Sequence, residues 1–137
     1  SHYHGRDGLK AMMEQTDILI NLLPLTPNTH HMLNKETLAW LPKGAKLINF
    51  SRGAVVNTDD LLACLDSGPI EHAVLDVFEQ EPLPVESEVW SHPKITVLPH
   101  ISAPTNKETA AKIVADNIHL YRTENKLLES VDIKLGY

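Results

Sequence analysis

An arginine, a glutamate and a histidine in this sequence have the side chains needed for acid–base chemistry on a small anion. Arg52 follows an apolar stretch that ends at Phe50, Glu81 follows LDVF, and His100 follows ITVLP. The guanidinium of arginine can hold a carboxylate through two parallel hydrogen bonds, a geometry that lysine cannot reproduce. Imidazole exchanges a proton near neutral pH, and a nearby carboxylate raises its pKa and favours its protonated form. These residues predict a site that binds an anion and transfers a proton.

Each of these residues also has an ordinary structural interpretation. Arg52 could form a surface salt bridge or brace its loop, and His100 could be a hydrogen-bonded residue at a strand end. Glu79 competes with Glu81 as the partner of His100, but its context favours a solvated carboxylate. Gly53 is expected to let the backbone come close to a ligand.

The histidines do not form a recognisable metal-binding pattern. The chain has 8 histidines, but His2 with His4, and the adjacent His30 and His31, lack cysteines or carboxylates at ligand spacing. We therefore predict no metal site. The sequence also contains neither a P-loop nor a G-x-G-x-x-G motif.

The composition is that of an ordinary globular protein. The chain has 137 residues, of which 42% are hydrophobic and 22% charged, enough to bury the core of one domain. A formal charge of −6 gives no reason to expect nucleic acid or an anionic membrane as a partner. The longest apolar run, ILINLLPL, is too short to span a bilayer. Cys64 cannot form an internal disulfide, so we expect a small buried helix residue and a reducing cytoplasm.

Helical and strand patterns alternate along the chain, which predicts a parallel sheet with crossover helices. Apolar runs predict strands over residues 17–23, 45–50, 72–78 and 95–99. Helices are predicted over residues 6–15, 35–41, 59–68 and 105–125. Asn34 and Thr58 are the expected N-caps of the second and third helices.

The unusual residues follow the predicted strands. The loops LPLTPNT, SRG, DVFEQEP and PHISAPT each come directly after or overlap a strand end. In parallel α/β sheets, ligands bind beyond the carboxyl ends of the strands. We therefore expect Arg52, Glu81 and His100 to meet at one edge of the sheet.

Longer stretches extend this interpretation to a family. The segments NLLPLTPNTHHMLN, LPKGAKLINFSRGAVVNTDDLLACLDSG and AVLDVFEQEPLPVESEVWSHPKITVLPHISAPT resemble, in order and spacing, the C-terminal half of the D-isomer-specific 2-hydroxyacid dehydrogenases. The spacing of Arg52, Glu81 and His100 is in keeping with that family. The resemblance implies the C-terminal half of a Rossmann-type, doubly wound parallel sheet, followed by a long helix that returns to the substrate domain.

The resemblance also implies roles for the three residues. Arg52 would hold the carboxylate of a 2-oxo acid and polarise its carbonyl, NAD(P)H would deliver hydride to C2, and His100, paired with Glu81, would protonate the oxygen. Small substrates such as glyoxylate and hydroxypyruvate are expected. NADP is slightly favoured over NAD, and the complete protein is expected to be a homodimer.

Further residues match cofactor-binding positions of the family. Asp76 matches the position that binds the nicotinamide carboxamide. The positions that match the loop under the cofactor and the walls around the nicotinamide are Leu23, Pro24, Thr29, Phe50, Ser51, Arg52, His100, Ser102 and Ala103.

The chain departs from the family in its extent. Residues 1–104 correspond to the C-terminal part of the NAD(P)-binding domain, and residues 105–137 to the linking helix and the return to the substrate domain. The glycine-rich dinucleotide motif of the family lies upstream of Ser1, so a chain that truly begins there is expected to have little reductase activity. The alternatives are a non-catalytic dinucleotide-sensing or corepressor protein, or a fragment that acts only as an association module.

Overall fold

The computed structural model describes residues 1–128 and 130–132. It consists of two compact units, Ser1–Ser102 and Ala103–Tyr137. The first unit contains the sheet and all the residues predicted to do chemistry. The second contains the long helix.

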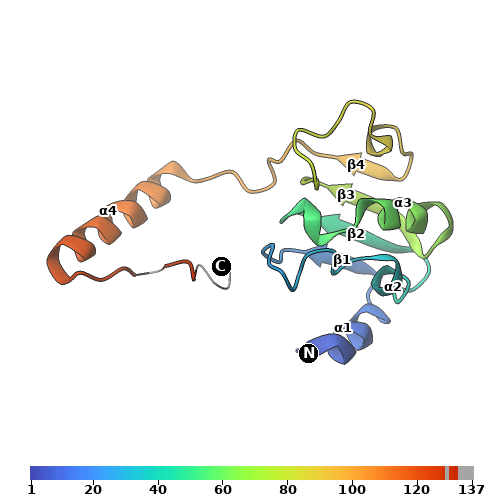
Figure 1. Cartoon of the computed structure of the whole chain (residues 1–137), viewed down its shortest axis with the longest axis horizontal. Coiled ribbons are helices and arrows are strands. Elements are labelled where there is room, and N and C mark those ends of the chain that lie inside the picture. Colours follow the sequence, from blue (N-terminus) through green and yellow to red (C-terminus); the bar gives the residue numbers. More distant parts are fainter. Residues whose placement is uncertain (129, 133–137) are drawn as a thin grey trace. The chain divides into compact units, whose positions relative to one another are not determined.

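A parallel sheet of four strands forms the centre of the first unit (Figure 1). The strands are β1 (Ile18–Asn21), β2 (Ala45–Asn49), β3 (Ile70–Leu75) and β4 (Ile95–Val97), paired in chain order. In register, Ile20 lies beside Ile48 and Ile48 beside Val74. All four predicted strands are present, which confirms the parallel α/β architecture. Each strand ends earlier than predicted, because the chain leaves the sheet to form the loops that carry the polar side chains.

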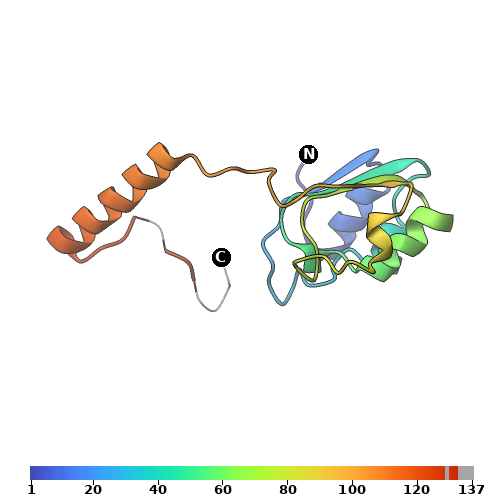
Figure 2. The same cartoon turned by 90° about the horizontal axis from the view of Figure 1, so that it is seen from above.

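Three helices cover one face of this sheet (Figure 2). They are α1 (Gly5–Met13), α2 (Lys35–Leu38) and α3 (Thr58–Ser67), accompanied by the short 3-10 turns η1 (Gly53–Val55) and η2 (Glu88–Trp90). The core between these layers includes Met13, Leu38, Leu47 and Leu65, all fully buried. The predicted burial of Cys64 on α3 is confirmed as well.

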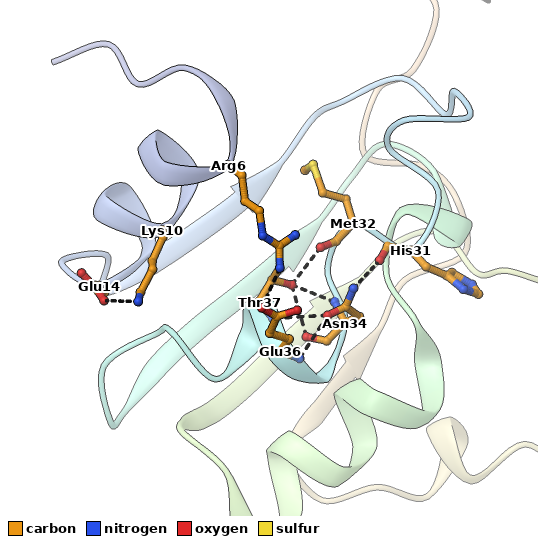
Figure 3. Close-up of polar contacts among 8 residues, drawn as sticks. All are labelled: Arg6, Lys10, Glu14, His31, Met32, Asn34, Glu36 and Thr37. Atoms are coloured by element: carbon orange, nitrogen blue, oxygen red, sulfur yellow. Dashed lines mark hydrogen bonds and ion pairs between the residues drawn. The ribbon is translucent and has the colours of Figure 1, made fainter.

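The sequence identified one helix cap and misplaced another. Asn34 caps α2 as predicted: its side chain accepts from the amides of Glu36 and Thr37, and the Thr37 hydroxyl in turn accepts from the Asn34 amide (Figure 3). The helix is shorter than predicted, because the chain tightens into turns after Leu38. Asn57, and not Thr58, caps α3, since its side chain accepts from the Asp60 amide. Placing the cap at Thr58 was therefore wrong by one residue.

The opposite face of the sheet is open within residues 1–102. Ile18 and Ile20 on β1 are 54% and 55% exposed, whereas Leu19 and Asn21, which point to the other face, are buried. The continuous apolar run predicted a strand buried on both faces. In the first unit only one face of β1 is covered, because all three of its helices pack on the same side of the sheet.

The second unit is built around α4 (Lys107–Glu124). The Asn106 side chain caps this helix by accepting from the amides of Glu108 and Thr109. The helix is present as predicted, but its apolar side chains, such as Ile113 and Ile118, are more than two-fifths exposed. Among the described residues, none of the helices is long and apolar enough to cross a membrane.

Candidate active site

The three residues with candidate chemistry come together at the carboxyl edge of the sheet. Arg52 follows β2, Glu81 lies in the loop after β3, and His100 follows β4. All three line one pocket of about 240 Å³. Parallel strands present their carboxyl ends at the same edge, which is why residues far apart in sequence share this pocket.

Two asparagines tie the loops after β1 and β2 together. Asn21 and Asn49 are the last residues of these neighbouring strands, and both are buried. Asn21 Nδ2 donates to Asn49 Oδ1 at 2.9 Å and to Ser51 Oγ at 3.1 Å. Asn49 Nδ2 donates to the Arg52 carbonyl at 3.2 Å. Burial without partners would cost these amides about 1–3 kcal/mol each, so the network fixes the start of the Arg52 loop.

Ser51 completes this network. Its hydroxyl donates to the Leu23 carbonyl at 2.7 Å and accepts from the Arg52 amide at 2.6 Å. Arg52 Nη1 donates to the Ser51 carbonyl at 2.7 Å, and the rest of this exposed guanidinium is available to an anion. Sequence reasoning missed Asn21 and Asn49. Their signal was a carboxamide at the end of each of two otherwise apolar strands.

Gly53 has a structural role that the sequence did not predict. A Cβ at this position would lie 1.9 Å from the Phe78 carbonyl carbon and 2.3 Å from the Glu79 amide nitrogen. The glycine therefore lets another segment of the chain come close to its backbone. This contact places the loop that carries Glu81 against the loop that carries Arg52.

Glu81 contacts His100 directly. Glu81 Oε2 lies 2.9 Å from His100 Nδ1, and Glu81 Oε1 accepts from the Phe78 amide at 2.9 Å. The Phe78 amide lowers the pKa of Glu81, and the hydrogen bond and charge of His100 lower it further, although burial opposes them. Glu81 is therefore ionised at neutral pH and can only accept from Nδ1. The other ring nitrogen, Nε2, is left for proton exchange with a ligand.

Asp76 holds the backbone that follows His100. This carboxylate is 2% exposed, and its two oxygens accept from the amides of Ile101 and Ser102, each at 2.9 Å. Burial by itself would raise the pKa of Asp76, but the Ser102 and Ile101 amides, the Ser102 side chain and the charge of His100 together lower it. His100 itself has a left-handed backbone, with φ 56°. The two hydrogen bonds that Asp76 accepts fix the backbone directly after this turn.

The lowered pKa of Asp76 predicts a pH-dependent stability. The folded protein binds fewer protons at this group than the unfolded chain, so its contribution is complete at neutral pH and is lost below about pH 4. We expect Asp76→Asn to lower the free energy of unfolding by about 1–3 kcal/mol at pH 7, because the two part-buried amides lose a charged acceptor. The variant should also lose stability less steeply on acidification. Urea unfolding between pH 3 and 7 measures both effects.

Glu71→Gln is the matched control for this prediction. The Lys46 side chain lowers the pKa of Glu71 through a hydrogen bond and its charge, but both side chains are at least half exposed. Water screens such a pair, so its removal should change the acid side of the curve very little. A change in Glu71→Gln equal to that in Asp76→Asn would contradict the structural role of Asp76.

The remaining predicted cofactor positions of the first unit lie in or beside the loops after β1 and β2. Leu23 is 40% exposed, Pro24 is exposed, and Phe50 is partly buried. The Thr29 hydroxyl donates to the Pro24 carbonyl at 2.6 Å, which closes the loop after β1 on itself. Ala103 belongs to the second unit.

Glu79 is exposed to solvent, as predicted, and it also pairs with a histidine. Its Oε1 lies 2.7 Å from His31 Nε2. His30, His31 and Glu79 each offer a ligand atom, and these atoms all lie within 4.8 Å of one another. No carboxylate stands at ligand spacing from these histidines along the chain, because Glu79 is brought beside them only by the fold.

Comparison with protein families identifies the first unit. Residues 1–102 match the model of the D-isomer-specific 2-hydroxyacid dehydrogenase NAD-binding domain.

Solved structures give the same result along nearly the whole chain. A D-isomer-specific 2-hydroxyacid dehydrogenase from Xanthobacter autotrophicus Py2, in complex with NADPH and MES, is 42% identical with a TM-score of 0.93, over 98% of this chain and 56% of that one. An NADPH-dependent glyoxylate/hydroxypyruvate reductase from Sinorhizobium meliloti, in complex with NADP and sulfate, is 37% identical with a TM-score of 0.90, over 98% and 44%. A phosphoglycerate dehydrogenase from Lactobacillus plantarum is 32% identical with a TM-score of 0.69, over 90% and 41%. The chain thus spans about half the length of these proteins.

Proposed function

This chain belongs to the D-isomer-specific 2-hydroxyacid dehydrogenase family, and from that premise we propose that the protein containing it is an NAD(P)-dependent reductase of small 2-oxo acids. Glyoxylate and hydroxypyruvate are the proposed substrates. The observation that carries the proposal is the pocket that Arg52 shares with the paired Glu81 and His100. It combines a cation for the substrate carboxylate with a proton donor for the new hydroxyl group.

Each of the three residues has a defined task in this proposal. Arg52 holds the carboxylate of the 2-oxo acid and draws electron density from the adjacent carbonyl. His100 gives a proton from Nε2 to the carbonyl oxygen as it becomes an alkoxide. Glu81 accepts from Nδ1–H, keeps the ring in the required orientation and stabilises the charged imidazolium. In the reverse direction, His100 takes the proton from the hydroxyl group.

The carboxyl edge of the sheet has suitable groups for a nicotinamide cofactor. When bound, the cofactor supplies or accepts the hydride at C2 of the acid. Leu23, Pro24 and Phe50 provide apolar surface for its ring, and Thr29 holds the loop on which the first two lie. Asp76 is the proposed acceptor for the nicotinamide carboxamide.

The proposal also covers the cofactor, the oligomeric state and the cellular location. We assign NADP a slight preference over NAD, and a homodimer in the cytoplasm as the working form. The names of the similar proteins include both a glyoxylate/hydroxypyruvate reductase and a phosphoglycerate dehydrogenase. Substrate choice is therefore the finer part of the proposal, to be measured with a panel of 2-oxo acids.

Arg52→Lys tests the proposed carboxylate clamp in the complete enzyme. Lysine keeps the charge but loses the two parallel hydrogen bonds. We expect kcat/KM for glyoxylate to fall by the equivalent of about 2 kcal/mol or more, or roughly 30-fold. Steady-state oxidation of NADPH measures this.

Arg6→Lys is the control for this substitution. Arg6 is an exposed arginine that pairs with Glu36 at 2.6 Å, away from the pocket residues, and its replacement should leave kcat/KM unchanged. Equal kcat/KM in Arg52→Lys and the wild-type enzyme would remove Arg52 from the mechanism. Cofactor binding without any turnover in the wild-type protein would favour the dinucleotide-sensing alternative.

A further inference from the structure

We propose that His30, His31 and Glu79 form a binding site for a divalent transition-metal ion, with Zn²⁺ as the ion best matched to its ligands. His30 and His31 lie in the loop after β1, and Glu79 lies in the loop after β3. Their three ligand atoms lie within 4.8 Å of one another. The bound ion would connect two loops that are 48 residues apart in sequence.

The donor set fits zinc in kind and number. Imidazole nitrogen and carboxylate oxygen are common zinc ligands, and two histidines with one glutamate leave a fourth, open position for water. Alkaline-earth ions prefer sites made of oxygen atoms alone. The ligands therefore favour zinc over calcium or magnesium.

The backbone brings the two histidine rings together. His31 has φ 48°, in the left-handed region that side chains other than glycine rarely adopt. The two ring centroids lie 4.0 Å apart, at an angle of 34°. Such a backbone costs about 1 kcal/mol or more and persists only where the surroundings hold it.

Hydrogen bonds on both sides of the His31 peptide supply that support. Its amide donates to the Ala54 carbonyl at 2.8 Å, and its carbonyl accepts from Asn34 Nδ2 at 2.9 Å. Figure 3 shows the His31 ring directed away from these contacts of its backbone with Asn34. The fixed backbone thus positions the ring, whose Nε2 faces Glu79 Oε1 at 2.7 Å and whose Nδ1 lies 3.5 Å from Asn57 Nδ2.

Small side-chain movements would complete the coordination. Zinc lies about 2.0–2.2 Å from nitrogen and oxygen ligands, so tetrahedral ligand atoms lie roughly 3.3 Å apart. His31 Nε2 and Glu79 Oε1, now 2.7 Å apart, would separate slightly, and the His30 ring would adjust within the 4.8 Å that contains all three ligand atoms. His30 and Glu79 are exposed, so neither movement disturbs the core. Metal ions bind the deprotonated forms of histidine and glutamate, so the affinity should fall as the pH is lowered.

The competing explanation is a simple ion pair between His31 and Glu79. That pair uses His31 and Glu79 alone, whereas a metal site also uses His30. Substituting His30 therefore separates the two explanations without breaking the pair. His30→Gln also carries little risk to folding, because the side chain is exposed.

Isothermal titration with Zn²⁺ of the full-length protein that carries this chain tests the proposal. We expect one site whose affinity falls at least about tenfold in His30→Gln, and which binds more weakly at pH 5.5 than at pH 7.5. An ion that binds only the folded state raises Tm. The rise in Tm with Zn²⁺ should therefore be smaller in His30→Gln than in the wild type, and smaller at pH 5.5 than at pH 7.5. Excess EDTA should abolish the rise.

His92→Gln is the matched control. His92 also faces a carboxylate, with Nε2 3.3 Å from Asp66 Oδ1, but it belongs to no group of three potential ligands among the described residues. His92→Gln should leave the affinity for Zn²⁺ unchanged. Unchanged affinity in His30→Gln, or an equal fall in His92→Gln, would overturn the proposal, as would the absence of Zn²⁺ binding. The test measures binding alone, so its outcome is independent of the proposed reductase activity.

Discussion

Replacing His100 by glutamine is expected to lower kcat of the complete enzyme by about 10²–10⁴-fold, the usual contribution of a positioned general acid. Glutamine has no group that gives up a proton near neutral pH, although it can still donate a hydrogen bond. The rates of glyoxylate reduction and of glycolate oxidation should both fall, since His100 Nε2 gives the proton in one direction and takes it in the other. Steady-state rates in both directions, at saturating cofactor, measure the effect.

Two variants make this prediction specific. His72→Gln replaces another histidine of the sheet, which lies on β3 with its Nε2 2.9 Å from Thr96 Oγ1. This substitution should leave kcat unchanged. Glu81→Gln keeps an acceptor for His100 Nδ1 but loses the negative charge that stabilises the imidazolium. The fall in kcat should be smaller in Glu81→Gln than in His100→Gln. The pH profile of kcat should also change in Glu81→Gln. A normal kcat in His100→Gln would exclude the proposed acid.

Replacing Gly53 by alanine is expected to affect both folding and activity. The new methyl group would meet the carbonyl carbon and oxygen of Phe78 at 1.9 and 2.1 Å. These are backbone atoms, so the overlap can be relieved only by moving apart the loop that carries Arg52 and the loop that carries Glu81. We expect about 3 kcal/mol of destabilisation, measured by urea unfolding, and a large fall in kcat because Glu81 loses its position beside His100.

Gly44→Ala separates this overlap from the general cost of losing a glycine. Gly44 has φ 90°, but an added Cβ would meet no atom within 4 Å. Alanine there should cost only the backbone strain of about 1–2 kcal/mol and leave kcat unchanged. If Gly53→Ala kept full activity and stability, the close approach of the two loops would not be needed for the site.

The periodicity of the sequence was sufficient for the architecture. Continuous apolar runs separated by helical patterns predicted four parallel strands, and all four are present. Asn34 was recognisable as a cap because its side chain acts on amides only two and three residues away. The ends of the strands were less well predicted, since an apolar residue just past a strand looks the same in sequence as one within it.

The grouping of Arg52, Glu81 and His100 was also predictable in outline. Each follows a predicted parallel strand, and such strands end at one edge of a sheet. The resemblance of three long segments to one family supported the same grouping. Which glutamate faces His100 depended on the path of the loop after β3, and the structure places Glu81 there and Glu79 beside His31.

The chemical groups of the site, the parallel strands and the edge at which those groups gather were all predictable from the amino-acid sequence. These properties follow from local periodicity and from the geometry of any parallel sheet. Three contacts became visible only in the folded protein: Gly53 makes room for a neighbouring loop, Asp76 accepts from the amides after His100, and Glu79 lies beside two histidines. Such contacts join residues more than 20 positions apart, and their distances depend on how separate loops pack against one another.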